Sequence, residues 1–432
     1  MNHFRSANAH RSPPSRALRL GKRTLGLLAC LVALSPLAVA AQAVPEPALA
    51  APRARALEGI VFKCSAPTLA RLEPELIAYF ASVGVDTRLL TRTADKPDTL
   101  SYTLMPALAD GNTLTLIDRP ELGLRDALVE LPAAKGTTRT VLTVSKGEIA
   151  YAMLQTGRAT VFTGSACDVQ ALVDQVGIRQ NTVAWAERLN WRWPEGGSAA
   201  WNKKYWNKGD LVKGMPLYAA VNDAFIHQDK YAIGCYTATK LVVLQGVLDY
   251  YQRVKKDPAG LALVQARLLQ DGRPLSFIEP GLMWSFESTF TDYDRVREGK
   301  LLALQQGVAA KNFIPGDWAY FLNTDPVTYE KTGYEGSNAI YLGRDRFDDY
   351  YNDHHHFYSY KEKLDEVYQW RNKVFSASRD VAKVTPLSAV DLAKLSQTPE
   401  QGGLLLALRA VPHLFGYQPL PALRPLAGSL TQ

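Results

Sequence analysis

Cysteine and histidine are scarce in this chain, whose 432 residues include only four cysteines and seven histidines. Thiol and imidazole chemistry is therefore confined to a few positions. Runs of lysine and arginine are missing after residue 43, so electrostatics gives no reason to expect a nucleic-acid partner. The apolar stretch 25–40 is shorter than the roughly 20 residues that a membrane-spanning helix needs. These absences exclude the simplest arguments for a nucleic-acid-binding or membrane-spanning protein.

The first 43 residues have the pattern of a secretory signal peptide: basic residues, an apolar stretch, and then the small-residue run 38–43. We expect cleavage after Ala40 or Ala43, and an exported protein that is periplasmic or extracellular, with no stable membrane anchor. The formal net charge is +7, and six positive charges lie in this segment. The mature chain is therefore nearly neutral.

The remaining length is too great for one ordinary core, and we predict an α+β protein with more than one domain. A linker at 44–56 precedes a small N-terminal α/β domain at 57–189, for which no role is evident. A second domain covers 190–380, and a helical and Pro-rich tail covers 381–432, with helices at 388–396 and 403–411. Within the first domain we expect strands at 57–62, 100–104, 113–117, 140–144 and 160–163, and helices at 67–83, 147–156 and 167–186.

Three cysteines remain after the signal peptide, in a compartment where disulfides persist. Cys64 and Cys167 both lie near the edges of predicted strands in the first domain. They are candidates for a disulfide, which would leave Cys235 reduced. The alternative is three buried thiols that have no chemical role.

Cys235 is our candidate nucleophile. Apolar residues recur after it at the spacing of one buried helical face, which predicts a helix over 235–253 with the cysteine in its first turn. The unpaired amide groups and the dipole of a helix start favour a thiolate. Gly234 leaves room for a substrate carbonyl to approach the backbone.

A thiol nucleophile needs a base or an orienting partner. Beyond the signal peptide the histidines are His227, His354, His355, His356 and His413. We expect a strand from Phe357, with His354 and His356 on one face and His355 on the other. Neighbours on a strand cannot all reach one ion, so we predict neither a metal nor any other cofactor. Strands that follow glycine turns are expected within 314–321 and 334–343.

Three ordered motifs carry a resemblance to a known family. They are Tyr-Ala-Ile-Gly-Cys-Tyr-Thr-Ala-Thr-Lys at 231–240, Gly-Asp-Trp-Ala-Tyr-Phe-Leu-Asn at 316–323, and Gly-Ser-Asn-Ala-Ile-Tyr-Leu-Gly-Arg-Asp at 336–345. Over roughly 225–375 the chain resembles the bacterial spore-coat protein-glutamine gamma-glutamyltransferases. The resemblance implies a calcium-independent transglutaminase with a papain-like, NlpC/P60-related core, in which the helix that begins with cysteine packs on an antiparallel sheet.

The chain departs from this family at two catalytic positions. A glutamate directly precedes the family's cysteine and another lies in its third motif, whereas this chain has Gly234 and Ser337 there. We therefore predict a Cys–His pair in which His354 or His356 serves Cys235, helped by Glu335 or Asn338. The predicted substrate-binding residues are Gly234, Ser337, Trp201 and Trp206.

The resemblance implies ping-pong acyl transfer from a glutamine side chain to a lysine amine or to water. Its partners would be proteins or peptides with glutamine and lysine side chains. Two alternatives stay open from the residues alone: a cell-envelope cysteine amidase or peptidase of the NlpC/P60 type, and a catalytically silent binding relative.

Overall fold

The computed structural model describes residues 57–194, 199–271, 303–328, 334–374, 384–398, 401–420 and 423. The predicted signal peptide and the predicted linker lie outside the described residues. Residues 56–432 form one compact unit. Within the part of the chain that is described, no helix is both long and apolar enough to cross a membrane.

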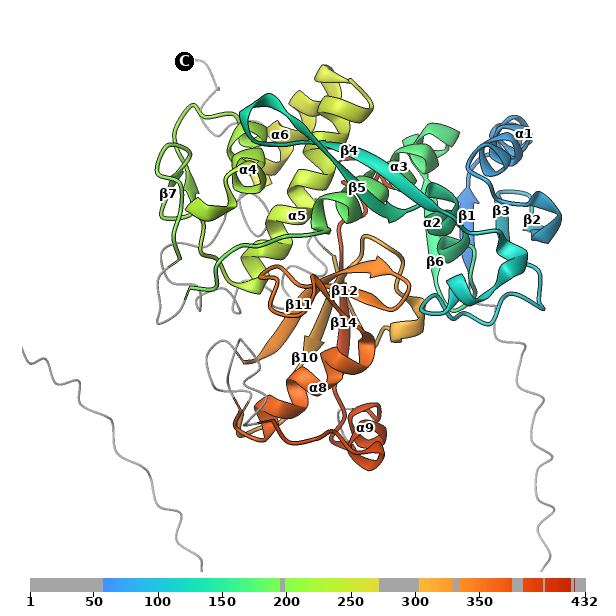
Figure 1. Ribbon diagram of the computed structural model, residues 1–432. Helices are drawn as coiled ribbons and strands as arrows, with labels where there is room; N and C mark the ends of the chain where they lie inside the picture. Colours follow the sequence, from blue (N-terminus) through green and yellow to red (C-terminus); the bar gives the residue numbers. More distant parts are fainter. Residues whose placement is uncertain are drawn as a thin grey trace, which may run out of the picture. The chain divides into compact units, whose positions relative to one another are not determined.

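The N-terminal part is a four-stranded sheet with helices against it (Figure 1). Strands follow the order β2-β3-β1-β6, and only β1 and β6 run parallel. The strands are β1 (Gly59–Lys63), β2 (Leu90–Lys96), β3 (Thr99–Leu104) and β6 (Ala159–Thr163), and the helices are α1 (Ala66–Ser82), α2 (Lys146–Met153) and α3 (Val169–Ala186). The strand predicted at 113–117 is wrong, because Leu116–Asp118 form a turn of 3₁₀ helix.

Cys64 and Cys167 form a disulfide that joins the end of β1 to the segment before α3. The bridge closes a separation of 103 residues. A closed loop of that size restricts the unfolded chain, which stabilises the fold by roughly 2–4 kcal/mol. A hairpin of β4 (Asp126–Pro132) and β5 (Thr138–Val144) extends from this region, packs on α3, and is drawn across it in Figure 1.

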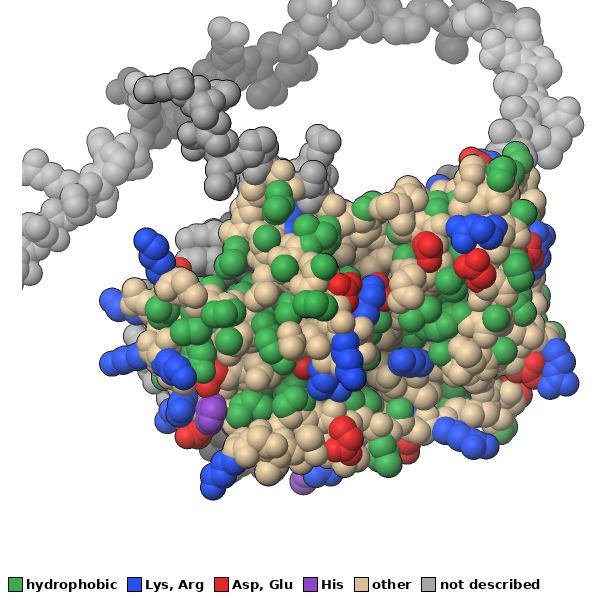
Figure 2. Space-filling model, turned by 90° about the horizontal axis from the view of Figure 1, so that it is seen from above, with side chains coloured by type: hydrophobic (Ala, Val, Ile, Leu, Met, Phe, Trp, Pro, Cys, Tyr) green, Lys and Arg blue, Asp and Glu red, His purple; other side chains and the backbone are tan. Residues whose placement is uncertain are grey.

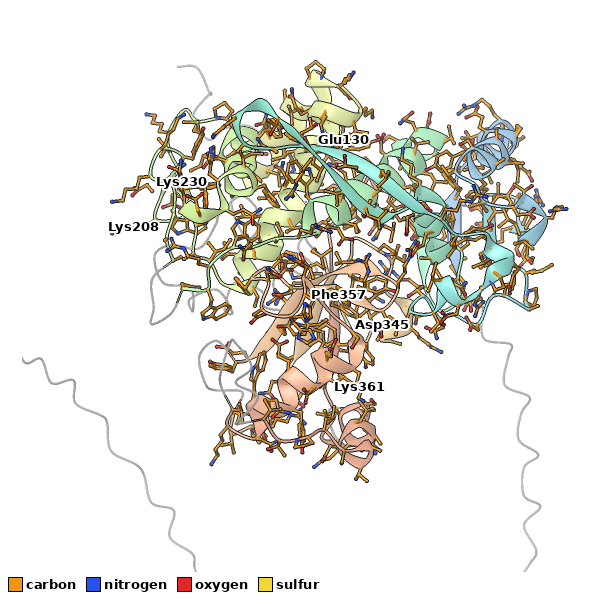
Figure 3. The ribbon with its side chains drawn as sticks, viewed as in Figure 1. Glu130, Lys208, Lys230, Asp345, Phe357 and Lys361 are labelled. Atoms are coloured by element: carbon orange, nitrogen blue, oxygen red, sulfur yellow. A yellow bond between two sulfur atoms is a disulfide. The ribbon has the colours of Figure 1, made fainter. Side chains whose placement is uncertain are left out.

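Helix α5 (Cys235–Asp249) lies in the middle of the molecule. Every residue after Cys235 in this helix is buried, not only one face as predicted, because α3, α4 and β11 all pack on it. The neighbouring elements are α4 (Leu217–Ile226), a π-helical turn at Tyr250–Val254, α6 (Pro258–Asp271), and the short strands β7 (Trp206–Asn207) and β8 (Asp210–Leu211). Lys208 and Lys230 extend outward from the edge of this helical part (Figure 3).

The second sheet has six antiparallel strands in the order β13-β12-β11-β10-β14-β9. Its central strand β11 is buried along its whole length. Ile340 and Leu342 join the core that contains α5, whereas Ala339 and Tyr341 join a second core against α8. The elements are β9 (Ala303–Gln306), β10 (Trp318–Leu322), β11 (Gly336–Gly343), β12 (Arg346–Asp348), β13 (Phe357–Tyr358), β14 (Leu405–Ala410), α8 (Tyr360–Arg371) and α9 (Ala389–Leu395).

The predicted C-terminal helix at 403–411 is wrong. That segment forms β14, which pairs with β10 on one side and β9 on the other. A short apolar run is compatible with a buried strand and with a buried helix. Here the run pairs with β10 and β9 and is therefore a strand. The tail therefore completes the sheet that carries the predicted site.

One hydrophobic core also runs across the boundary predicted at 189–190. Trp185 and Trp191 both pack on Phe225, with ring centroids 5.2 and 5.1 Å away. The face shown in Figure 2 has basic and acidic side chains interspersed among apolar ones. The α+β class is confirmed, as are the helix that begins at Cys235 and the antiparallel sheet against which it packs.

Candidate active site

Cys235 is the first residue of α5, and Gly234 is its N-cap. Among the described residues it is the one free cysteine, and its side chain is half buried. The cysteine therefore lies at a helix start, as predicted. It lines a pocket between α5, β11 and α8.

Asn338 of β11 donates a hydrogen bond from Nδ2 to the Cys235 Sγ over 3.8 Å. The amide is oriented by its other end, because Asn338 Oδ1 accepts from Trp318 Nε1 at 2.9 Å and from Arg409 Nη1 at 3.0 Å. Trp318 and Arg409 both donate N–H groups, so the atom of Asn338 that they contact must be its amide oxygen. The NH₂ group of Asn338 therefore faces the sulfur of Cys235. Arg409 comes from β14, so the corrected C-terminal strand contributes directly to the site.

The surroundings of Cys235 favour the thiol over the thiolate. Burial raises the pKa of Cys235 above its usual value, and the hydrogen bond from Asn338 opposes that rise only in part. The charge of Glu366 raises this pKa further, and that of Lys363 lowers it. The expected thiolate at a helix start is therefore wrong for the resting protein, and a base must take the thiol proton.

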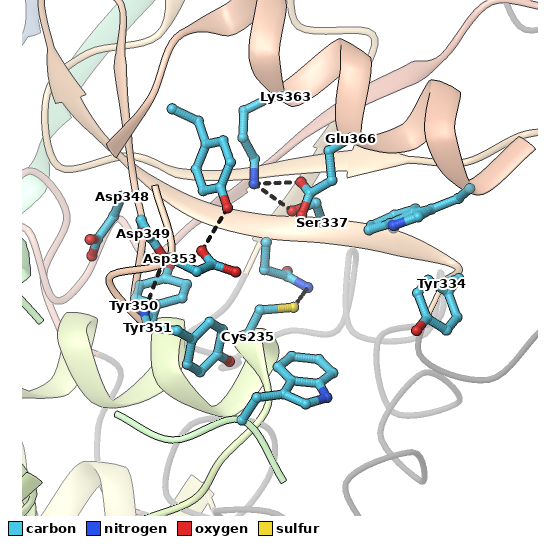
Figure 4. A pocket seen from close by; sticks show the side chains of 15 residues that line it. Cys235, Tyr334, Ser337, Asp348, Asp349, Tyr350, Tyr351, Asp353, Lys363 and Glu366 are labelled. Atoms are coloured by element: carbon cyan, nitrogen blue, oxygen red, sulfur yellow. Dashed lines mark hydrogen bonds and ion pairs between the residues drawn. The ribbon is translucent and has the colours of Figure 1, made fainter. Parts of the chain in front are cut away.

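Carboxyl groups are the acid–base groups of this pocket. Figure 4 shows Asp353 and Glu366 above Cys235, with Asp348 and Asp349 to the left of them. Aromatic rings form much of the remaining wall, and they come from Trp193, Tyr334, Tyr350, Tyr351, Tyr358 and Trp370.

Glu366 reaches the pocket from α8. Lys363, one helical turn earlier, donates to Glu366 Oε2 and to Ser337 Oγ, each over 2.7 Å. Lys363 thereby holds Glu366 beside the strand position where the resembled family has its glutamate. Glu366 of α8 and Ser337 of β11 thus contact the same ammonium group.

Asp353 lies in the loop before β13 and accepts a hydrogen bond from the Tyr358 hydroxyl at 2.8 Å. Asp353 as a residue is exposed, but the protein packed around its carboxyl group partly desolvates it and, together with the negative charge of Asp349, raises its pKa to about 7. A carboxyl group with such a pKa can both take and return a proton near neutral pH.

Asp348, at the end of β12, is buried with 2% of its surface exposed. Both of its carboxylate oxygens lack a hydrogen-bond partner within the described part of the chain. Burial and the charges of Asp349 and Glu187 raise its pKa well above the usual value.

The predicted Cys–His pair is not formed. His354 Nε2 lies 2.6 Å from Glu362 Oε1, and its ring stacks on Tyr358. The ring of His356 donates from Nδ1 to the Leu189 carbonyl at 3.2 Å. The strand predicted from Phe357 is present as β13, but the predicted common face of His354 and His356 is wrong, because His355 and His356 have left-handed φ angles of 55° and 69° that place them in a turn before the strand. Neither histidine lines the pocket.

The other predicted residues divide between the pocket and the core. Asn338 and Ser337 line the pocket, whereas Glu335 does not. Trp201 and Trp206 are buried against each other with centroids 5.7 Å apart, away from the pocket, because large rings are most easily accommodated in the core. The indoles of the pocket are Trp193 and Trp370.

We did not predict Glu366, Lys363 or Asp353 as residues of the site. A signal for the first two existed: Ser359 and Glu362 form a capping box that starts α8, and this start places Lys363 and Glu366 on one face. No comparable signal marked Asp353, because its neighbours are brought together only by the fold. Among the described residues, no group of three His, Cys, Asp or Glu side chains could hold a metal ion.

A family model described as protein-glutamine gamma-glutamyltransferase matches residues 134–395, more than half of the chain. This range is wider than the resemblance read from the three motifs, and it includes α3 and part of the predicted N-terminal domain. No curated protein matches the chain. Among solved structures, the chain is similar to a transglutaminase from Geobacillus stearothermophilus (without C-terminal extension), with 17% identity, a TM-score of 0.34, and coverage of 58% of this chain and 96% of that one.

Proposed function

The chain belongs to the protein-glutamine gamma-glutamyltransferase family, and from this premise we propose that Cys235 is the nucleophile and that Glu366 and Asp353 replace the glutamates missing at 234 and 337. Family membership makes the protein a transglutaminase-like, cysteine-dependent acyltransferase. The observation that supports the residue assignment is one pocket that holds a free thiol, an oriented amide and two carboxyl groups.

In the first step, Glu366 takes the thiol proton and Cys235 Sγ attacks the side-chain amide carbon of a glutamine. The carbon–nitrogen bond breaks, the proton passes to the leaving nitrogen, and ammonia leaves a thioester on the enzyme. The transient oxyanion is stabilised by Asn338 Nδ2 and the backbone N–H groups at the start of α5. Asn338 suits this role because Trp318 and Arg409 fix its orientation.

In the second step, a lysine amine attacks the thioester. Asp353 takes a proton from the amine as the isopeptide bond forms, the carbon–sulfur bond breaks, and Asp353 returns that proton to the leaving thiolate, which regenerates the thiol. The aromatic walls from Trp193, Tyr351 and Trp370 exclude water, which favours the amine over hydrolysis.

We also propose that the protein acts outside the cytoplasm, on proteins that carry glutamine and lysine side chains. Two features support export: the signal-like pattern of residues 1–43 and the disulfide between Cys64 and Cys167. N-terminal sequencing of protein from the periplasm and the medium tests this; an intact N-terminus in the cytoplasmic fraction would contradict it.

The test of the function is incorporation of a biotinylated primary amine into a glutamine-containing protein, followed by mass spectrometry and by release of ammonia. We expect label in the wild type and none with Cys235→Ala. Glu366→Gln and Asp353→Asn should each slow the reaction about 10²–10⁴-fold, because a general acid–base group contributes on that scale, and the double variant should be at least as slow. Glu335→Gln is the matched control, since Glu335 does not line the pocket.

Ammonia release without label would mean that water is the acceptor. Wild-type rates in the Glu366/Asp353 double variant would overturn the carboxylate assignment. Retained activity in Cys235→Ala would overturn the proposal as a whole.

A further inference from the structure

A second pocket lies between the β4–β5 hairpin and the ends of α3 and α4. Its walls include Arg139 of β5, Arg188 and Arg192 of the segment after α3, and the apolar side chains of Phe225 and Ile226. None of these residues lines the pocket of Cys235. The catalytic proposal therefore leaves this concavity without a role.

Positive charge in this pocket is poorly balanced. No carboxylate within the described ranges forms an ion pair with Arg139, Arg188 or Arg192. Asp229 also lines the pocket, but Arg192 contacts its backbone carbonyl, 3.2 Å from Nη2, and not its carboxylate. Three arginines thus line a pocket that has one acidic lining residue.

Arg139 is the least satisfied of the three. Its Nε and Nη2 atoms are buried and have no hydrogen-bond partner among the described residues. Its guanidinium lies over the Trp185 ring at 5.9 Å, which covers one face of the group but accepts no in-plane hydrogen bond. Burial, and then the positive charge of Arg188, lower the pKa of Arg139. The repulsion between Arg139 and Arg188 and the unpaired buried N–H groups of Arg139 both cost free energy. A bound anion would reduce both costs.

We propose that this pocket binds an oxyanion, with the half-buried Arg139 as the anchor and Arg188 and Arg192 at the exposed rim. The planar guanidinium presents paired N–H donors that match the spacing of phosphate or carboxylate oxygens. Phe225 and Ile226 supply an apolar wall for whatever group carries the anion. A free phosphate and the carboxylate of an acidic side chain on a protein substrate share this chemistry.

The pocket is linked to the active site by a short segment. Arg192 accepts a hydrogen bond at its carbonyl from the Ile233 N–H, 3.0 Å away and two residues before Cys235. The next residue, Trp193, lines the catalytic pocket. Residues 192 and 193 therefore border the two pockets, one residue on each.

The experiment is isothermal titration calorimetry on the full mature chain carrying Cys235→Ala, so that the result does not depend on catalysis. Inorganic phosphate and an acetylated, amidated di-glutamate peptide are titrated separately. Arg139→Gln is expected to weaken binding at least about tenfold, because a charged hydrogen-bonded partner is lost. Arg125→Gln, an exposed arginine just before β4, removes the same charge and should leave binding unchanged.

Binding of both probes, or of phosphate alone, would support a site for free oxyanions, and binding of the peptide alone would support a substrate-carboxylate site. In either case Arg188→Gln, at an exposed position, should weaken binding without affecting folding. No heat with either probe, or equal binding by Arg139→Gln with an unchanged unfolding temperature, would overturn the proposal.

Discussion

Two carboxyl groups on the six-stranded sheet are equally buried but have opposite surroundings. Asp317 and Asp348 are each 2% exposed. Asp317, just before β10, binds Arg158 and Arg179 and accepts from the Ile314 N–H at 2.7 Å. Asp348, at the end of β12, has no hydrogen-bond partner in the described part of the chain. The difference separates a carboxylate that holds the fold together from one that belongs to a reactive pocket.

The pKa shifts of Asp317 and Asp348 follow from these different contacts. Burial alone would raise the pKa of Asp317, but the charges of Arg158 and Arg179 outweigh it and hold that pKa below the usual range. Burial raises the pKa of Asp348, and neighbouring acids raise it further. Burial by itself therefore does not fix the direction of the pKa shift of a carboxyl group; the neighbouring charges and hydrogen-bond donors decide it.

Removing the charge of Asp317 should have the largest effect on stability. Asp317→Asn leaves two buried arginines without a counter-charge, and we expect the free energy of unfolding to fall by about 3–5 kcal/mol. Urea denaturation at neutral pH measures this. A loss below about 1 kcal/mol would mean that the ion pairs are not buried as described.

Asp348→Asn should act in the opposite direction. A raised pKa in the folded state means that the native protein holds the proton more tightly, so stability is highest below the unfolded pKa and falls as pH rises through the folded one. The variant should gain about 1–3 kcal/mol at roughly pH 8 and nothing near pH 3. An equal change at both pH values would contradict the assignment.

A smaller and more local effect is expected at Asp353. Since its pKa is about 7, the group is protonated below that pH and cannot act as a base. Activity of the wild type should rise as pH increases through about 7, and Asp353→Asn should lose that rise. The pH dependence of kcat/KM checks this, and an unchanged profile in the variant would exclude Asp353 as the base.

Much of the fold could be predicted from local patterns. The helix that begins at Cys235 follows from its apolar spacing, and β10 and β11 follow from glycine turns before apolar runs. The apolar run at 405–410 was misassigned because a strand buried on both faces has no period that distinguishes it from a buried helix.

The candidate site could be predicted only in part. Cys235 and Asn338 lie within recognisable motifs, whereas Glu366 and Asp353 come from elements that only the tertiary fold brings to them. The prediction that His354 or His356 serves Cys235 failed because both histidines were given the alternating geometry of the strand that follows them. Two left-handed residues, His355 and His356, turn the chain there and direct both predicted rings to other partners.

The central claim is that Cys235 forms a thioester with a glutamine side chain. Intact-protein mass spectrometry after acid quenching, with a blocked glutamine dipeptide and no amine, tests it most directly. We predict a single adduct whose mass equals the dipeptide minus ammonia, located on Cys235 by peptide mapping and absent from Cys235→Ala. An adduct at another residue, or ammonia release by the Cys235→Ala variant, would contradict the account.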